Sequence, residues 1–140
     1  MTKAESFSFS IAERGEVSGT TFNWSFTAKR MLSIRDRITR DGIRRQLIGE
    51  RPQDAEANTV MRAEMLAFLQ VSLTETPKAW KEAGNGLDLF DDNIILKVYD
   101  LTVDGQNKAI EEAEKAGDEA KEKLRKVAKS KKADEEAKTE

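Results

Sequence analysis

The stretch SFSFSIAERGEVSGTTFNWSFTAKR, residues 6–30, alternates apolar and polar side chains on both sides of a short connection. The large apolar residues of each half fall on one face: Phe7, Phe9 and Ile11 in the first half, and Phe22, Trp24 and Phe26 in the second. A period of two around RGEVSG predicts an antiparallel β-hairpin with one aromatic face and one solvated face. Because a two-stranded hairpin is only marginally stable alone, its aromatic face must pack on the chain's own helices, the favoured interpretation, or on a partner.

The segment after the hairpin has the pattern of a capped helix. Ser33 with Asp36 is close to a capping box, and Gly49 marks the expected end. The apolar residues Ile34, Ile38, Ile43 and Leu47 are predicted to lie near one face, and the opposite side carries Arg35, Arg37, Arg40, Arg44 and Arg45. Interleaved acidic residues favour a solvated, ion-paired face or an acidic partner over nucleic acid.

The next helical pattern gives the best core candidate. Its apolar stripe consists of Ala57, Val60, Met61, Met65, Phe68 and Leu69, widened by Leu66 and Leu73. Methionines in such a stripe usually fill gaps in a core. The alternative is that Met61 and Met65 form an adaptable groove for a partner helix.

Residues 76–100, TPKAWKEAGNGLDLFDDNIILKVYD, join two apolar segments. Pro77 is expected to begin a short helical turn that points Trp80 inward, and residues 84–86 tolerate the positive φ that breaks a chain. Asp91 or Asp92 stands where the N-cap of the following helix belongs. Because the acidic residues lack the spacing of a calcium loop, we expect a helix start here and no metal or acid/base site.

The composition changes after Gly105. Residues 106–140 contain ten basic and ten acidic residues, and their only large apolar side chains are Ile110, Leu124 and Val127. So few apolar positions cannot bury a helix face, which predicts a charged helical extension that frays toward its end. The expected fold is α+β and mostly α: a hairpin packed on a small helical bundle over residues 1–105, with a long charged helix over 106–140.

Several function classes are excluded by the composition. The 140 residues include no cysteine and no histidine, which removes thiolate or imidazole ligands and nucleophiles that need a histidine base. The net charge of −2 and the lack of a long apolar run argue against nucleic-acid and membrane partners. We therefore expect a non-enzymatic protein with no catalytic, cofactor-binding or metal-binding residues.

The order of these motifs resembles the tail assembly chaperones of long-tailed bacteriophages. The resemblance covers roughly residues 5–105: the aromatic hairpin, FTAKRMLSIRDRITRDGIRRQLIG, a helix ending in AFLQVSL, the TPKAW turn, and LDLFDDNIILKVYDLTV. It implies a protein of the host cytoplasm that coats the tape measure protein before tail tube subunits polymerise, and that is missing from the finished virion. The tail tube protein is a second implied partner, and self-association is left open. The family also often makes a longer product by ribosomal frameshifting near the end of the shorter one, and the expected place is the stretch AKSKKADEEAKTE.

The resemblance and the apolar residues together suggest where a partner would bind. The first candidate surface is the hairpin, with Phe22, Trp24 and Phe26, and the second is the groove near Met61 and Met65. A structural tail or connector subunit and a nucleic-acid-binding regulator are the alternative functions, and an enzyme is the least favoured.

Overall fold

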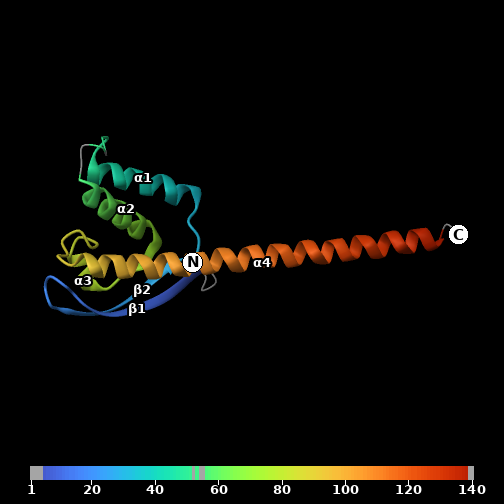
Figure 1. The fold of residues 1–140 in the computed structure, drawn as a ribbon, viewed down its shortest axis with the longest axis horizontal. Helices are drawn as coiled ribbons and strands as arrows, with labels where there is room; N and C mark the ends of the chain where they lie inside the picture. The colour runs from blue at the N-terminus through green and yellow to red at the C-terminus, as the bar shows by residue number, and fades with distance from the viewer. Residues whose placement is uncertain (1–4, 52, 54–55, 139–140) are drawn as a thin grey trace. The chain divides into compact units, whose positions relative to one another are not determined.

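The computed structural model describes residues 5–51, 53 and 56–138, with side chains as far as Lys129. The elements in these residues are β1 (Ser6–Arg14), β2 (Thr21–Lys29), α1 (Ile34–Ile48), α2 (Ala57–Ser72), β3 (Leu73–Glu75), α3 (Lys78–Glu82) and α4 (Asp92–Lys138). The chain divides into two units between Gln106 and Asn107. As predicted, the fold is α+β and mostly helical, with an N-terminal antiparallel hairpin on helices (Figure 1).

The predicted hairpin is confirmed. β1 and β2 pair without a register shift from Ser6–Lys29 to Arg14–Thr21, so residues 15–20 form the connection. The outer face carries a ladder of hydroxyl groups, in which Ser10 Oγ lies 2.9 Å from Ser25 Oγ. The aromatic side chains occupy the opposite face, as the period of two requires.

A third strand was not expected. Leu73, predicted to widen the apolar stripe of a helix, instead begins β3 and lies opposite Ala28 of β2. The chain after Ser72 becomes extended and pairs with the free edge of β2, and Pro77 then disfavours helical backbone at Thr76. The sheet therefore has the order β1-β2-β3.

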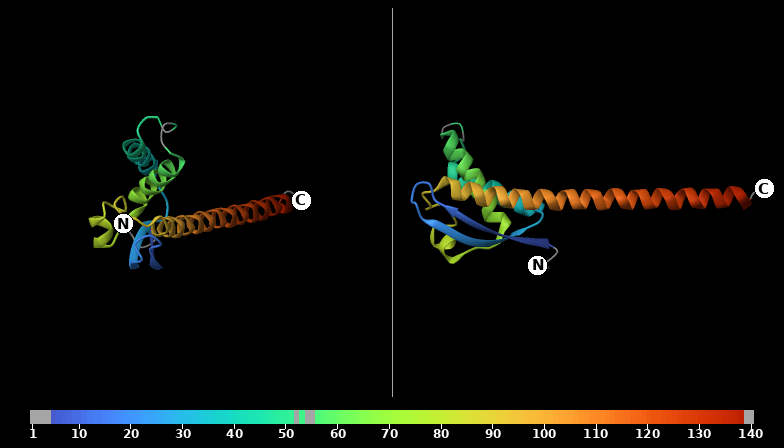
Figure 2. Two further views of the ribbon diagram at one scale, coloured as in Figure 1. Left: turned by 60° about the vertical axis from the view of Figure 1, so that its left-hand side comes forward. Right: turned by 60° about the horizontal axis from the view of Figure 1, so that its bottom comes forward.

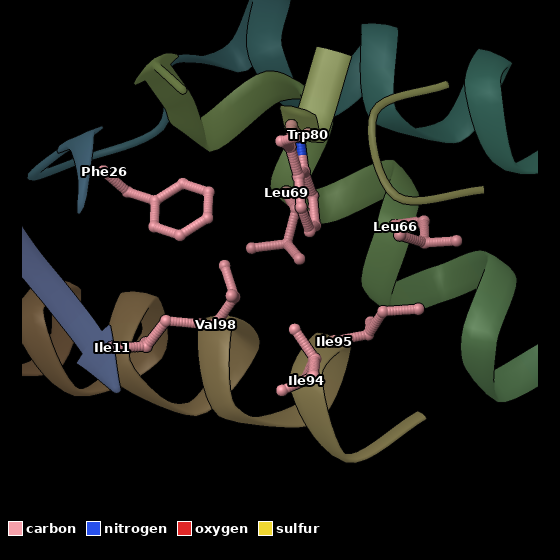
Figure 3. Close-up of a cluster of buried hydrophobic side chains, with 8 residues drawn as sticks. All are labelled: Ile11, Phe26, Leu66, Leu69, Trp80, Ile94, Ile95 and Val98. Atoms are coloured by element: carbon pink, nitrogen blue, oxygen red, sulfur yellow. The ribbon is translucent and has the colours of Figure 1, made fainter. Parts of the chain in front are cut away.

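Within residues 5–106, the first turns of α4 lie between the hairpin on one side and the α1–α2 pair on the other (Figures 1 and 2). The core fills the space between these layers. Its buried members are Ile11, Phe26, Leu66, Leu69, Trp80, Ile94, Ile95 and Val98 (Figure 3). α2 and α4 pack on the hairpin through these side chains, which buries most of its aromatic face.

Trp80 is the largest of these buried side chains and is only 2% exposed. Its ring contacts Phe26 edge-on, with centroids 5.4 Å apart, and it lies in one core cluster with side chains of α2 and α4. Trp80 therefore joins the sheet to these two helices and the two helices to each other. The predicted inward position of Trp80 on a short helix after Pro77 is confirmed. At the break that follows, Gly86 has a φ of 96° and lies so close to Trp80 that a side chain there would clash.

The capping of α1 is confirmed, but the face that carries its apolar residues is not buried. Ser33 Oγ accepts a hydrogen bond from the Asp36 N–H at 3.1 Å, and Asp36 Oδ2 accepts from the Ser33 N–H at 3.0 Å. Yet Ile34 and Ile38 are 74% and 68% exposed, and no residue of α1 is buried. Because α1 packs mainly against α2, it half-buries Ile43 and leaves Ile34 and Ile38 mostly in solvent.

The core face of α2 also differs from the predicted stripe. Ala57 and Met61 are exposed, whereas Ala63, Leu66, Ala67 and Leu69 are buried. Small alanines allow α2 to approach its neighbours closely, and a search for large apolar residues passes over them. The stripe on α2 is therefore rotated away from Met61.

The extension is helical as far as Lys138, and every side chain from Ile110 to Lys129 is exposed. Its three large apolar residues are among them, as their sparse spacing predicts. Fraying of its end stays a prediction. In the described part of the chain, no helix has both the length and the apolar character needed to cross a membrane.

Candidate functional site

The aromatic residues proposed as the first partner surface are largely occupied within the chain. Phe26 is only 1% exposed, which corrects the expectation that it is open to a partner. Phe22 and Trp24 are half-buried, and Trp24 contacts the edge of Trp80 with ring centroids 6.0 Å apart. The hairpin face is therefore mainly part of the core, because α2, α3 and α4 all reach it.

The second proposed surface is a groove. Met61 and Met65 lie along it, and the structure adds Phe68 from the same helix and Leu96 and Tyr99 from α4. The groove has a volume of about 500 Å³ and is open to solvent along one side. Met61 is 57% exposed and Leu96 is 47% exposed, so apolar surface on two helices faces the opening.

Charged side chains of both signs form the rim of this groove. Arg40, Asp41 and Arg44 come from α1, and Glu64 comes from α2. Arg44 Nη1 lies 3.3 Å from Glu64 Oε1, whereas its Nε is buried without an acceptor in the described part of the chain. A buried donor without an acceptor costs about 1–3 kcal/mol.

The sequence pattern gave Met61 and Met65 but missed Phe68, Leu96 and Tyr99 as members of this surface. Phe68 was expected in the core, and its ring packs edge-to-face on Tyr99 with ring centroids 5.3 Å apart. Leu96 lies beside the buried Ile95 in a run of apolar residues. Only its exposure in the folded chain distinguishes it, and no signal in the sequence does so.

The acidic stretch before α4 binds the hairpin connection. Asp91 is buried, and its Oδ1 accepts hydrogen bonds from the N–H groups of Val17 at 2.7 Å and Ser18 at 2.8 Å. Its Oδ2 accepts from the Ser18 hydroxyl at 2.7 Å. α4 begins at Asp92, as predicted, but the carboxylate of Asp91 anchors a turn more than seventy residues away in the sequence, where a cap on its own helix was expected.

These hydrogen bonds explain the electrostatics of Asp91. The Ser18 hydroxyl and then the Ser18 and Val17 N–H groups hold the pKa of Asp91 below its ordinary value of 3.8, although burial opposes them. Gly15 in the same connection touches the carboxylate so closely that a Cβ atom would overlap it. Both carboxylate oxygens of Asp91 thus accept hydrogen bonds from the chain itself. Asp91 is therefore a structural anchor for the hairpin connection.

Asn93 completes this anchor at the end of β1. Its Nδ2 donates to the Arg14 carbonyl at 2.9 Å, and its Oδ1 accepts from the Glu16 N–H at 3.1 Å. No group of three or more acidic residues in the described ranges is arranged to hold a metal ion. Asp91 and Asn93 of the DLFDDN stretch join the hairpin to the start of α4 through these hydrogen bonds.

The arginine-rich side of α1 is partly ion-paired. Arg40 Nε lies 3.9 Å from Oδ1 of Asp41, one of the interleaved acidic residues, and Arg44 pairs with Glu64 of α2. Comparison with protein-family models, with curated proteins and with solved structures found no match to this chain.

Proposed function

We propose that this chain is a tail assembly chaperone of a long-tailed bacteriophage and that it binds helical segments of the tape measure protein. The observation that carries this proposal is the open apolar groove lined by Met61, Met65, Phe68, Leu96 and Tyr99. The order of motifs along residues 5–105 supports it. Binding in the host cytoplasm before tail tube polymerisation, and absence from the virion, are parts of the same proposal.

The chemistry of the groove suits a client with repeated amphipathic helices. An apolar groove of this kind accepts the apolar face of a helix, in which anchors recur every three or four residues. Flexible methionine side chains adapt to different apolar surfaces, which a chaperone of a long and varied client requires. The mixed charges of the rim match the polar residues that flank the apolar stripe of such a helix.

The extension contributes solubility to this proposal. Its exposed charged side chains from Ile110 to Lys129 surround the helix on all sides. Interspersed charges of both signs disfavour association of apolar surfaces. A chaperone that holds an aggregation-prone client would benefit from such a segment.

Co-expression with the tape measure protein of the same phage tests the proposal. We expect the client to stay soluble and to co-purify with the chain. Met61→Glu and Leu96→Glu, which put a charge on each wall of the groove, should each weaken capture about tenfold or more, because a charge opposes apolar contact. Ile34→Glu is the matched control, since Ile34 is exposed and apolar but does not line the groove.

Three outcomes would contradict the proposal. If the client remains insoluble, the chaperone assignment fails. If Ile34→Glu weakens capture as much as Met61→Glu does, the groove is not the binding surface. Stoichiometric amounts of the chain in purified virions would instead favour a structural tail subunit, a second candidate supported by the unpaired edge of β1.

A further inference from the structure

β1 is an edge strand with a long uncharged segment. It pairs with β2 on one side only, because the sheet order is β1-β2-β3. Ser8, Ser10 and Ala12 are exposed, and residues 8–12 carry no charge. Proteins usually protect such an edge with charged residues, proline or a covering element, since a bare edge pairs with other strands.

The hydrogen bonds at the two ends of the hairpin show which groups face this edge. The Arg30 N–H donates to the Glu5 carbonyl at 2.9 Å, and the Gly15 N–H donates to the Thr20 carbonyl at 2.8 Å. Because hydrogen-bonded pairs alternate along an antiparallel ladder, the odd-numbered residues of β1 bond to β2. The N–H and C=O groups of Ser8, Ser10 and Ala12 therefore point away from β2.

Side chains of the chain itself cover both ends of this edge. Arg30 Nε donates to the Ser6 carbonyl at 3.3 Å, and Asn93 Nδ2 donates to the Arg14 carbonyl at 2.9 Å. Between these two points, no described group bonds to the outward N–H and C=O groups of Ser8, Ser10 and Ala12. The uncovered segment is thus short and symmetric about Ser10.

We infer that a second copy of this chain pairs with this segment, β1 against β1 in antiparallel orientation, with the two-fold axis at Ser10. Ser10 then lies opposite Ser10 of the other copy, and Ser8 lies opposite Ala12. This register satisfies all six outward groups of each uncovered segment with its counterpart in the other copy. The two three-stranded sheets become one continuous sheet across the dimer.

The register also keeps equivalent faces together. Odd-numbered residues of one copy lie opposite odd-numbered residues of the other, so Phe9 faces Ile11 on the inner side of the sheet. Small residues meet on the outer side, and the serine ladder continues from Ser25 through Ser10 into the second copy. Because the uncovered segment is uncharged, no like charges are opposed. These matches favour a second copy over a strand of unrelated sequence.

A single cysteine tests the pairing, since the chain contains no other. In the proposed register the two Ser10 Cα atoms lie about 5.5 Å apart, within the range of a disulfide. Purified Ser10→Cys should therefore oxidise to a covalent dimer much faster than Ser25→Cys. Ser25 lies on the same outer face but in the central strand, so it is the matched control. Equal rates for the two variants would overturn the inference.

Charge substitutions test the interface in solution by sedimentation. The wild-type chain should sediment as a dimer at high concentration, and Ser10→Lys should weaken the dimer about tenfold or more because it opposes two like charges. An equimolar mixture of Ser10→Lys with Ser10→Glu should restore association, whereas Ser25→Lys should leave it unchanged. A wild-type chain that remains monomeric at all concentrations, or a dimer insensitive to Ser10→Lys, would overturn the inference. These experiments need no client, so their outcome is independent of the proposed function.

Discussion

The hairpin and α1 differ in how many elements hold them. α2, α3 and α4 all contribute side chains to the core beneath the hairpin, and Asp91 also binds its connection. α1 packs mainly against α2 and buries no side chain. The stability of this unit should therefore depend strongly on residues that touch the hairpin and weakly on residues of α1, and substitutions in the two regions test this difference.

The largest effect is expected at Trp80. Trp80→Ala should lower the free energy of unfolding by about 3–5 kcal/mol, because truncating a buried tryptophan leaves a large cavity. Urea denaturation followed by circular dichroism measures the change. Phe90→Ala is the control, since Phe90 is aromatic but 77% exposed, and it should change stability by less than about 0.5 kcal/mol. Similar losses for both variants would contradict the assignment of Trp80 to the core.

The anchor at Asp91 should give the next largest effect, and one that depends on pH. The folded state lowers the pKa of Asp91, so its carboxylate stabilises the fold fully above the ordinary value of 3.8. This contribution is lost as the pH falls through the lower pKa of the folded state. Asp91→Asn should therefore reduce the melting temperature at neutral pH, and the difference from the wild type should narrow in acid.

Asp92→Asn is the control for this experiment. Asp92 is the next residue, but it is exposed and forms an ion pair with Arg62 at 2.6 Å instead of binding the hairpin. An exposed ion pair contributes little, so Asp92→Asn should change the melting temperature less than Asp91→Asn. If the difference in melting temperature between the wild type and Asp91→Asn stays constant with pH, the proposed role of the Asp91 carboxylate as an anchor is contradicted.

Substitutions at two glycines inside helices test the difference in packing between the same two regions directly. A Cβ atom at Gly105 of α4 would overlap the ring of Phe7, whereas a Cβ atom at Gly42 of α1 meets nothing within 4 Å. Gly105→Ala should therefore destabilise the fold by about 1–3 kcal/mol through overpacking. Gly42→Ala should stabilise it by about 1 kcal/mol, because alanine is the better helix former. Urea denaturation of both variants measures the two changes, and equal signs would contradict the difference between the regions.

Local patterns predicted the parts of the fold that local chemistry determines. The period of two gave the hairpin, the Ser33–Asp36 pair gave the start of α1, and Pro77 with Trp80 gave α3 and its buried side chain. Each of these signals lies within a few residues of the structure that it specifies. The same patterns were sufficient for the α+β class.

Contacts between distant segments could not be predicted in the same way. Asp91 has the position of an N-cap, and nothing near it in the sequence indicates that its carboxylate bonds to Val17 and Ser18. Of the candidate groove, the sequence gave the methionines of α2 but missed Leu96 of α4, because the groove is formed only when the two helices meet. The exposure of the apolar face of α1 could not be predicted for a related reason, because periodicity does not show how many other elements pack against a helix.

The smallest effect is expected on the exposed apolar residues of α1. Ile34→Ser and Ile38→Ser should each change the free energy of unfolding by less than about 0.5 kcal/mol, as surface substitutions usually do. Both side chains are mostly in solvent, so their replacement removes little buried area. The measurement is again urea denaturation, made on a dilute sample so that association does not contribute. A loss of about 2 kcal/mol, the value for a buried isoleucine, would mean that α1 is covered in solution and that the two regions are equally packed.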